Sequence, residues 1–207
     1  MPNYTRRGKV LQVLSDQQFD QRVKEADFDN VAYAAYPVLL YYSGVRKREG
    51  LRTSAGQFTQ QGDTLFWDVG KRLKHGPKLA PLPLPATAWH MDKLLTAIEN
   101  AKQSGRYTFR WNRLEADTVD QPVFPFCPRT AYTVASQVFA YCHHARLSRI
   151  TWFFSPHPEL GRPQGYSIAE VQNWTGLTLN ALNFYIGLAK TEEMGRGMAQ
   201  LQELRAR

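Results

Sequence analysis

Cysteine is scarce in this sequence, with only Cys127 and Cys142 among 207 residues. Their spacing matches none of the motifs that hold a structural zinc ion, and two cysteines are too few for a disulfide framework. The sequence therefore predicts a reduced, intracellular protein whose fold depends on neither a metal site nor disulfide bonds.

Long apolar runs are missing as well. No stretch is long and apolar enough to span a bilayer, and the opening segment "MPNYTRRGKV" is polar and basic, without the hydrophobic region of a signal peptide. There are also no repeats and no low-complexity tracts. The 207 residues, 43% of them hydrophobic, fit one domain with a substantial core and no membrane partner.

Acidic residues are too few to balance the basic ones. Eighteen Asp and Glu stand against 26 Lys and Arg, which gives a net charge of +8 and a sequence pI of about 9.6. A basic surface favours nucleic acid or an anionic membrane as the partner. Because membrane and secretion signals are missing, we expect nucleic acid.

Capping patterns and apolar spacing predict a chain that is mostly helical. Ser15 and Ser167 each begin a capping box, and Gly176 ends the second of these helices. Further helices are expected over 30–42, kinked or interrupted at Pro37 and ending at Gly44, over 88–102, after Thr130 and over 180–190. The helix after Thr130 carries an apolar stripe of Ala131, Val134, Ala135, Val138 and Cys142.

Strand signals are confined to one short region. Residues 64–69, "TLFWDV", and the proline-limited segment "LAPLPLP" over 79–85 predict an antiparallel hairpin around the basic turn "GKRLKHGPK". Prolines at 122, 125 and 128 indicate irregular structure over 106–128. The predicted fold class is therefore mainly α with a small antiparallel β-sheet (α+β), in one domain without a linker.

One segment gathers hydrogen-bond donors next to apolar residues. In "HHARLSRITWFF", His143, Arg146 and Arg149 recur every three residues and share one face of a helix. Guanidinium groups on such a face suit phosphate oxygens, because their planar fork is always charged. The alternative is a solvated helix face beside a core.

Other chemistry-bearing residues lie elsewhere in the chain. Arg46 follows a helix end and precedes Glu49 by three residues, Lys71 follows a strand, and Tyr185 comes nine residues after Gly176. Each one taken alone has an ordinary structural explanation. Their order along the chain is more specific than any single member.

This ordered set resembles the catalytic domain of tyrosine recombinases, the integrase family, over about residues 12–190. The resemblance lies in five segments. They are "YYSGVRKREGLRTSAGQF", "FWDVGKRLKHGPKLAPLPL", "PVFPFCPRTAYTVASQVF", "HHARLSRITWFF" and "YSIAEVQNWTGLTLNALNFYIG". They correspond to the first arginine box, the lysine hairpin, the helix before the second box, the His-x-x-Arg box itself and the tyrosine segment.

The resemblance implies a role for each residue. Arg46 and Arg146 clamp the non-bridging phosphate oxygens, His143 adds a donor or helps to move a proton, and Glu49 orients this cluster. Lys71 is the general acid for the leaving 5′ oxygen, and Tyr185 is the nucleophile of a 3′-phosphotyrosyl intermediate. No metal, cofactor or ATP is required. Expected DNA-backbone contacts are Lys47, Arg48, Arg72, Lys74 and Arg149.

The sequence departs from the family pattern in three ways. Leu177 stands where the family has His or Trp, although Trp174 lies nearby, and the interval from Leu177 to Tyr185 is one residue short. The family also has an N-terminal domain that completes a clamp around DNA, and residues 1–14 are too few for one. A basic arm (1–14), a catalytic domain (15–190) and a C-terminal helical tail (191–207) are therefore expected.

The expected function is that of a site-specific DNA recombinase or integrase from a mobile element, virus or plasmid. It would act on double-stranded DNA in the cytoplasm of a prokaryotic cell and assemble there as a tetramer. A catalytically weakened DNA-binding regulator on the same scaffold is the alternative. A topoisomerase of type IB character, sharing the chemistry, is a more distant one.

Overall fold

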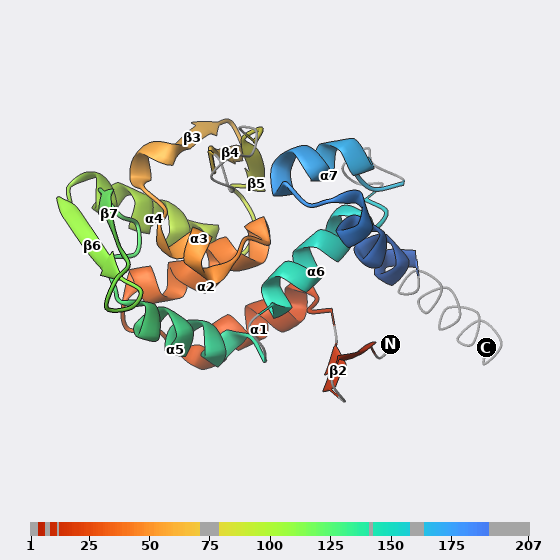
Figure 1. Cartoon of the computed structure of the whole chain (residues 1–207), viewed down its shortest axis with the longest axis horizontal. Coiled ribbons are helices and arrows are strands. Elements are labelled where there is room, and N and C mark those ends of the chain that lie inside the picture. The colour runs from red at the N-terminus through yellow and green to blue at the C-terminus, as the bar shows by residue number, and fades with distance from the viewer. Residues whose placement is uncertain are drawn as a thin grey trace.

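Helix α2 (Val31–Ser43) forms the centre of the molecule (Figure 1). The computed structural model describes residues 4–6, 9–11, 13–70, 79–140, 143–157 and 164–190. The α2 sequence "VAYAAYPVLLYYS" is apolar on every side, and the helix is buried from Ala34 to its end. Asn30 accepts the Ala32 N–H at 2.8 Å, and Gly44 ends the helix with a φ of 63°. The predicted bounds of this helix are confirmed.

The other helices surround α2. Three of them, α4 (Met91–Lys102), α5 (Pro128–Val138) and α6 (His144–Phe153), pack directly against it. Helix α1 (Asp16–Ala26) packs on α5, and its Phe19 ring stacks on Tyr41 of α2 at 3.9 Å. The remaining helical segments are α3 (Lys47–Leu51), the short 3₁₀ turn η1 (Ala55–Gln57), α7 (Ile168–Thr175) and residues 179–190.

Small antiparallel sheets complete the described structure. They are β1 (Tyr4–Arg6) with β2 (Lys9–Leu11), β3 (Phe58–Gln61) with β4 (Thr64–Trp67) and β5 (Leu82–Pro85), and β6 (Arg106–Arg110) with β7 (Ala116–Asp120). The predicted β4–β5 pair is present, with Leu65 opposite Leu84. The proline-containing β5 is an edge strand, because a proline cannot donate to a second neighbour. The expected α+β class, mainly helical, is confirmed, with more than one small sheet.

The prediction of irregular structure over 106–128 is wrong for its first half. Residues 106–110 alternate between outward and inward positions, with Phe109 fully buried and Arg110 exposed, as in a half-buried strand. The nearby prolines hid this period-two pattern. The hairpin turns at Asn112, whose side-chain oxygen accepts the N–H groups of Leu114 and Glu115 at 2.8 and 2.9 Å.

Two helix starts also differ from the predictions. Helix α5 begins at Pro128 instead of after Thr130, because proline at the first helical position has its φ already set for a helix. Its buried stripe is confirmed at Ala131, Val134, Ala135 and Val138, whereas Cys142 lies outside the described residues. Helix α4 begins three residues later than expected, after His90, whose φ is 62°.

Figure 1 shows how the elements are distributed along the longest axis. The β6–β7 hairpin lies at one end, and α7 with the helical residues 179–190 lies toward the other, with α2 and α6 between them. The basic loop 71–78 and the tail 191–207 fall outside the described residues. Within the described part of the chain, no helix combines the length and apolar character needed to cross a membrane.

Candidate functional site

The first part of the site is the turn between α2 and α3. Arg46 lies at the N-cap of α3 in an extended conformation, and its N–H donates to Glu49 Oε2 at 2.8 Å. Its Nη1 donates to the other oxygen, Glu49 Oε1, at 3.2 Å. Glu49 therefore fixes both the backbone and the side chain of Arg46. The Arg46 side chain stays 54% exposed, which leaves its other donors accessible to a ligand.

The second part is Arg146, in the first turn of α6. It is only 5% exposed, and its Nη1 donates to the carbonyl oxygen of Gly44 at 2.9 Å, across 102 residues of sequence. Its Nη2 is buried and has no hydrogen-bond partner among the described residues. A buried donor without a partner is costly, because the group has lost its water. Arg146 is therefore held in place by one end of its fork, and its guanidinium lies beside the Tyr185 phenol.

The electrostatics of Arg146 show which groups surround it. Burial lowers the pKa of its guanidinium, and a polar interaction with the Tyr185 phenol raises that pKa. The positive charge of Arg46 also lowers it, whereas the carboxylate of Glu49 raises it. Tyr185, Arg46 and Glu49 thus each lie within electrostatic reach of Arg146. The roles predicted for these four residues stay predictions.

Tyr185 lies on the helical residues 179–190 and is half-buried. Leu182, Leu188 and Ala189 of the same helix are buried, and Leu182 is part of the main hydrophobic core. The segment leading to it is set by α7, which ends at Gly176 with a φ of 61°. The predicted capping box at Ser167 is confirmed by the Glu170 N–H bond to Ser167 Oγ at 3.3 Å. Tyr185 is thus a phenol on an anchored helix beside a buried arginine.

Leu177 and Trp174 both have packing roles. Leu177 is partly buried against the core and offers no side-chain donor. The Trp174 ring packs against Phe153 at 5.5 Å and Tyr166 at 5.2 Å. Trp174 is therefore packed as a core aromatic and does not replace the donor that Leu177 lacks.

The two adjacent histidines have different environments. His143 is exposed at the N-cap of α6, and its carbonyl oxygen accepts the Leu147 N–H at 2.8 Å. His144 is 3% exposed, and its Nδ1 accepts the Ala140 N–H at 3.4 Å. Only His143 is placed at the surface, at the end of α6 that carries Arg146. Its predicted part in the chemistry stays a prediction.

Arg149 does not match the DNA-contact role expected of it. It is 4% exposed, and its guanidinium lies 3.8 Å from the Trp152 ring centre, 4.8 Å from Phe153 and 5.7 Å from Tyr42. Burial lowers its pKa to about 10. It is a core cation held by aromatic rings, since its place one turn below Arg146 turns it toward α2. In the sequence, this role was indicated by Trp152 and Phe153, which follow Arg149 by three and four residues and so lie on the same side of the helix.

The backbone of Gly44 lies close to both Arg146 and Arg149. Its carbonyl accepts from Arg146, and a Cβ on it would meet the Arg149 Cβ at 3.2 Å. A side chain here would also strain the left-handed backbone that ends α2. The sequence marked Gly44 only as a helix end, and nothing in it pointed to the bond with Arg146.

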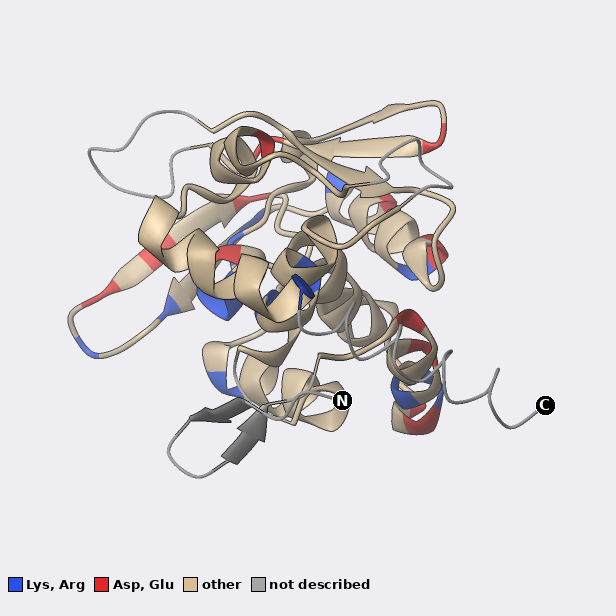
Figure 2. Cartoon of the chain, turned by 90° about the vertical axis from the view of Figure 1, so that its right-hand side faces the viewer, with Lys and Arg blue, Asp and Glu red and all other residues tan. Residues whose placement is uncertain are grey.

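The remaining predicted DNA contacts are partly engaged within the protein. The Lys47 ammonium lies 4.5 Å from the Tyr132 ring centre, and Arg48 forms ion pairs with Glu115 and with Asp117, the latter at 3.4 Å. These pairs raise the pKa of Arg48 and offset its charge, so it is not a free backbone contact. Figure 2 shows Lys and Arg on several elements, with Asp and Glu close to many of them.

The lysine hairpin is described only at its two flanks. Lys71, Arg72 and Lys74 lie outside the described residues. On either side of them, the Leu79 N–H donates to the Gly70 carbonyl oxygen at 3.2 Å, and the Ala80 N–H donates to Asn173 of α7 at 3.2 Å. The segment between the loop and β5 is therefore fixed to α7, the helix that precedes Tyr185.

No protein-family model matches the sequence, and no curated protein matches it. Solved structures similar to it include the XerH site-specific recombinase bound to its difH substrate in a pre-cleavage complex, with 14% identity and a TM-score of 0.53 over 88% of this chain and 53% of that one. A post-cleavage complex with palindromic difH gives 14% identity and a TM-score of 0.55, covering 88% and 50%. The chain thus spans about half the length of these recombinases, and it has the fold of a tyrosine recombinase catalytic domain.

Proposed function

We propose that this protein cleaves and rejoins double-stranded DNA through a 3′-phosphotyrosyl intermediate on Tyr185. The observation that carries the proposal is the environment of Arg146. Its guanidinium is buried beside the Tyr185 phenol, with Nη2 unpaired and the Arg46–Glu49 pair close by. An unpaired, fixed donor next to a nucleophile suits an anion that develops charge during reaction.

The reaction needs these charges because its substrate is an anion. The Tyr185 oxygen attacks the phosphorus, the bond from phosphorus to the 5′ oxygen breaks, and negative charge grows on the two non-bridging oxygens. Arg146 Nη2 and the exposed donors of Arg46 bind those oxygens. Their charge is worth more in this partly desolvated site than in water, because the local dielectric is lower.

Proton transfers complete the balance of the step. The Tyr185 phenol passes its proton to water or to His143 as it attacks, which the neighbouring cations favour. The departing 5′ oxygen takes a proton from Lys71. Glu49 keeps Arg46 in position through two hydrogen bonds, and His143 supplies a further donor or moves a proton. The reverse step, with a new 5′ hydroxyl, rejoins DNA without ATP.

The biological setting follows from the same proposal. The protein acts as a recombinase or integrase of a mobile element, virus or plasmid, in the cytoplasm of a prokaryotic cell, and assembles as a tetramer on DNA. The XerH recombinase, whose structure is similar, was solved with difH in a pre-cleavage complex and with palindromic difH in a post-cleavage complex.

One observation favours a second function. Leu177 is partly buried and brings no donor to the phosphate, where the family resemblance implies His or Trp. A site with one donor fewer stabilises the transition state less, so a DNA-binding regulator with weakened catalysis is the alternative.

A trapping experiment separates the two functions. On DNA with a nick close to the cleavage site, cleavage releases a short fragment that bears the new 5′ hydroxyl. Because this fragment diffuses away, the covalent adduct cannot religate, accumulates and survives SDS. We expect an adduct with the unchanged protein and none with Tyr185→Phe, while both bind DNA equally. Tyr166→Phe is the matched control, because Tyr166 packs among Trp152, Phe153 and Trp174. DNA binding without any adduct from the unchanged protein would support the regulator.

A further inference from the structure

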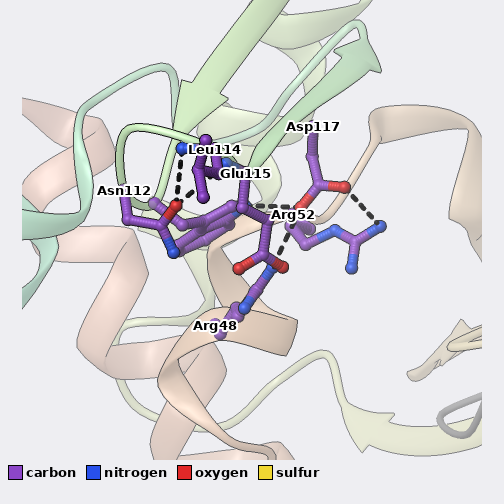
Figure 3. Close-up of polar contacts among 7 residues, drawn as sticks. Arg48, Arg52, Asn112, Leu114, Glu115 and Asp117 are labelled. Atoms are coloured by element: carbon purple, nitrogen blue, oxygen red, sulfur yellow. Dashed lines mark hydrogen bonds and ion pairs between the residues drawn. The ribbon is translucent and has the colours of Figure 1, made fainter.

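The β6–β7 hairpin reaches from one end of the molecule to α3, the helix that begins with Arg46. Figure 3 shows the contact: Arg48 forms ion pairs with Glu115 and Asp117, and Arg52 pairs with Asp117 at 3.4 Å. The Arg48 guanidinium also lies 4.3 Å from the centre of the Trp111 ring. Arg48 of α3 and Arg52 at its C-cap thus meet one carboxylate on the hairpin.

The tip of the hairpin holds these carboxylates in a fixed arrangement. The Trp111 Nε1–H donates to Asp117 Oδ2 at 2.5 Å, and the Trp111 N–H donates to the Glu115 carbonyl oxygen at 3.0 Å. Asn112 caps the turn through its bonds to the N–H groups of Leu114 and Glu115 (Figure 3). Asp117 is also only 24% exposed. Because it is oriented before it meets α3, less entropy is lost in forming the pairs.

The base of the hairpin is joined to the chain directly after α3. The Ala55 N–H donates to Gln121 at 2.9 Å, the Val123 N–H donates to Thr53 at 2.9 Å, and Ser54 Oγ donates to the Asp120 carbonyl oxygen at 2.7 Å. The hairpin therefore contacts both the side of α3 and the residues 53–55 that follow it. Movement of the hairpin would move α3 with it.

Helix α3 needs such support because it is very short. Its five residues, Lys47–Leu51, form about one turn, and an isolated helix of that length is not stable in water. Its inner side rests on α2, with the Tyr36 hydroxyl donating to the Lys47 carbonyl oxygen at 2.7 Å. Its outer side is held by the hairpin. The Arg46–Glu49 pair sits at the start of this single turn.

We propose that Asp117 is a positioning residue for the strand-transfer site. It acts through Arg48 and Arg52, which fix the orientation of α3 and with it the Arg46–Glu49 pair. The inference rests on the proposed function for its effect on cleavage, but not for its effect on α3. Asp117 touches neither substrate nor the reacting atoms.

The test uses two asparagine variants on the same strand. Asp117→Asn removes the charge that binds Arg48 and Arg52. Asp120→Asn is the matched control, because Asp120 pairs at 2.7 Å with Arg106 of the same hairpin, both side chains being highly exposed, and makes no ion pair with α3. Two measurements are made on full-length protein: the rate of adduct formation at saturating nicked DNA, and the dissociation constant of the DNA complex.

We expect Asp117→Asn to slow adduct formation about five- to thirtyfold, the range for a coupled network of charges. DNA affinity should change less than about twofold, because Asp117 is not a phosphate contact. Asp120→Asn should leave both values unchanged, and Asp117→Glu should restore most of the rate by keeping the charge. Equal losses in Asp117→Asn and Asp120→Asn would overturn the proposal, since hairpin stability would then be the cause.

Amide exchange gives a second measurement that does not depend on cleavage. The Gly50 N–H donates to Arg46 at 2.9 Å and the Arg52 N–H to Arg48 at 3.3 Å, so their protection reports on α3. Asp117→Asn should raise exchange at both amides relative to Asp120→Asn. If the unchanged protein forms no adduct, the proposed function fails, and this exchange result alone decides the positioning role. Unchanged exchange would refute it.

Discussion

Replacing Arg146 by methionine should separate catalysis from stability. The change keeps a long, unbranched side chain in a site that is only 5% exposed, and removes the guanidinium. It loses the charged hydrogen bond to the Gly44 carbonyl oxygen, worth about 1.5–3 kcal/mol. Against this, the variant no longer buries the unpaired Nη2 of Arg146, and such a buried unsatisfied donor costs about 1–3 kcal/mol. The two effects largely cancel, so the free energy of unfolding should shift by less than about 2 kcal/mol.

Cleavage should respond far more strongly. Removing one preorganised donor from an oxyanion-type site costs about 2.7–4 kcal/mol of transition-state stabilisation, or roughly 100- to 1000-fold in rate. Ground-state binding of DNA should weaken only slightly, because many other cations contact the backbone. The measurements are urea unfolding, the DNA dissociation constant and the rate of SDS-resistant adduct formation on nicked DNA.

Arg149→Met is the control for this variant. Arg149 lies one turn further along α6 and is equally buried, but its guanidinium faces the rings of Trp152, Phe153 and Tyr42. Its loss should change stability by a similar amount and leave cleavage within about threefold, since aromatic contacts worth about 2 kcal/mol are structural here. Our assignment is refuted if Arg146→Met cleaves normally, or if Arg149→Met loses cleavage as severely.

Three further outcomes are expected. If Lys71 is the general acid, Lys71→Ala should regain cleavage on DNA with sulfur at the bridging 5′ position, because a thiolate leaves without a proton; the rescue is measured as the rate ratio of the two substrates. The pKa of the exposed Cys127 thiol is lowered by hydrogen bonds from the Thr130 hydroxyl and N–H, so Thr130→Val should raise that pKa and slow alkylation by iodoacetamide at pH 7. If the tail 191–207 joins protomers on DNA, deleting it should leave single-site DNA binding intact and abolish higher-order complexes in a gel shift; normal assembly of the truncated protein would contradict this role.

Local sequence was enough to place most helix ends. Ser15 and Ser167 form their capping boxes with residues three positions later, and Gly44 and Gly176 end their helices with positive φ. Such features depend on a few consecutive residues, so they can be predicted from the sequence alone. The β6–β7 hairpin was missed because its alternation is short and lies beside prolines, and its stability comes from contacts with α3 and the core.

The ordered set of Arg46, Glu49, Arg146 and Tyr185 was also legible in the sequence, as residue types at characteristic intervals. Spacing alone could not distinguish Arg146 from Arg149, because both lie on one predicted face. Only the tertiary structure decided that one guanidinium meets the end of α2 beside Tyr185 while the other enters an aromatic cage. The reason is physical: periodicity fixes which side of a helix a residue occupies, whereas burial, charge and hydrogen-bond partners depend on the distant segments packed against that side.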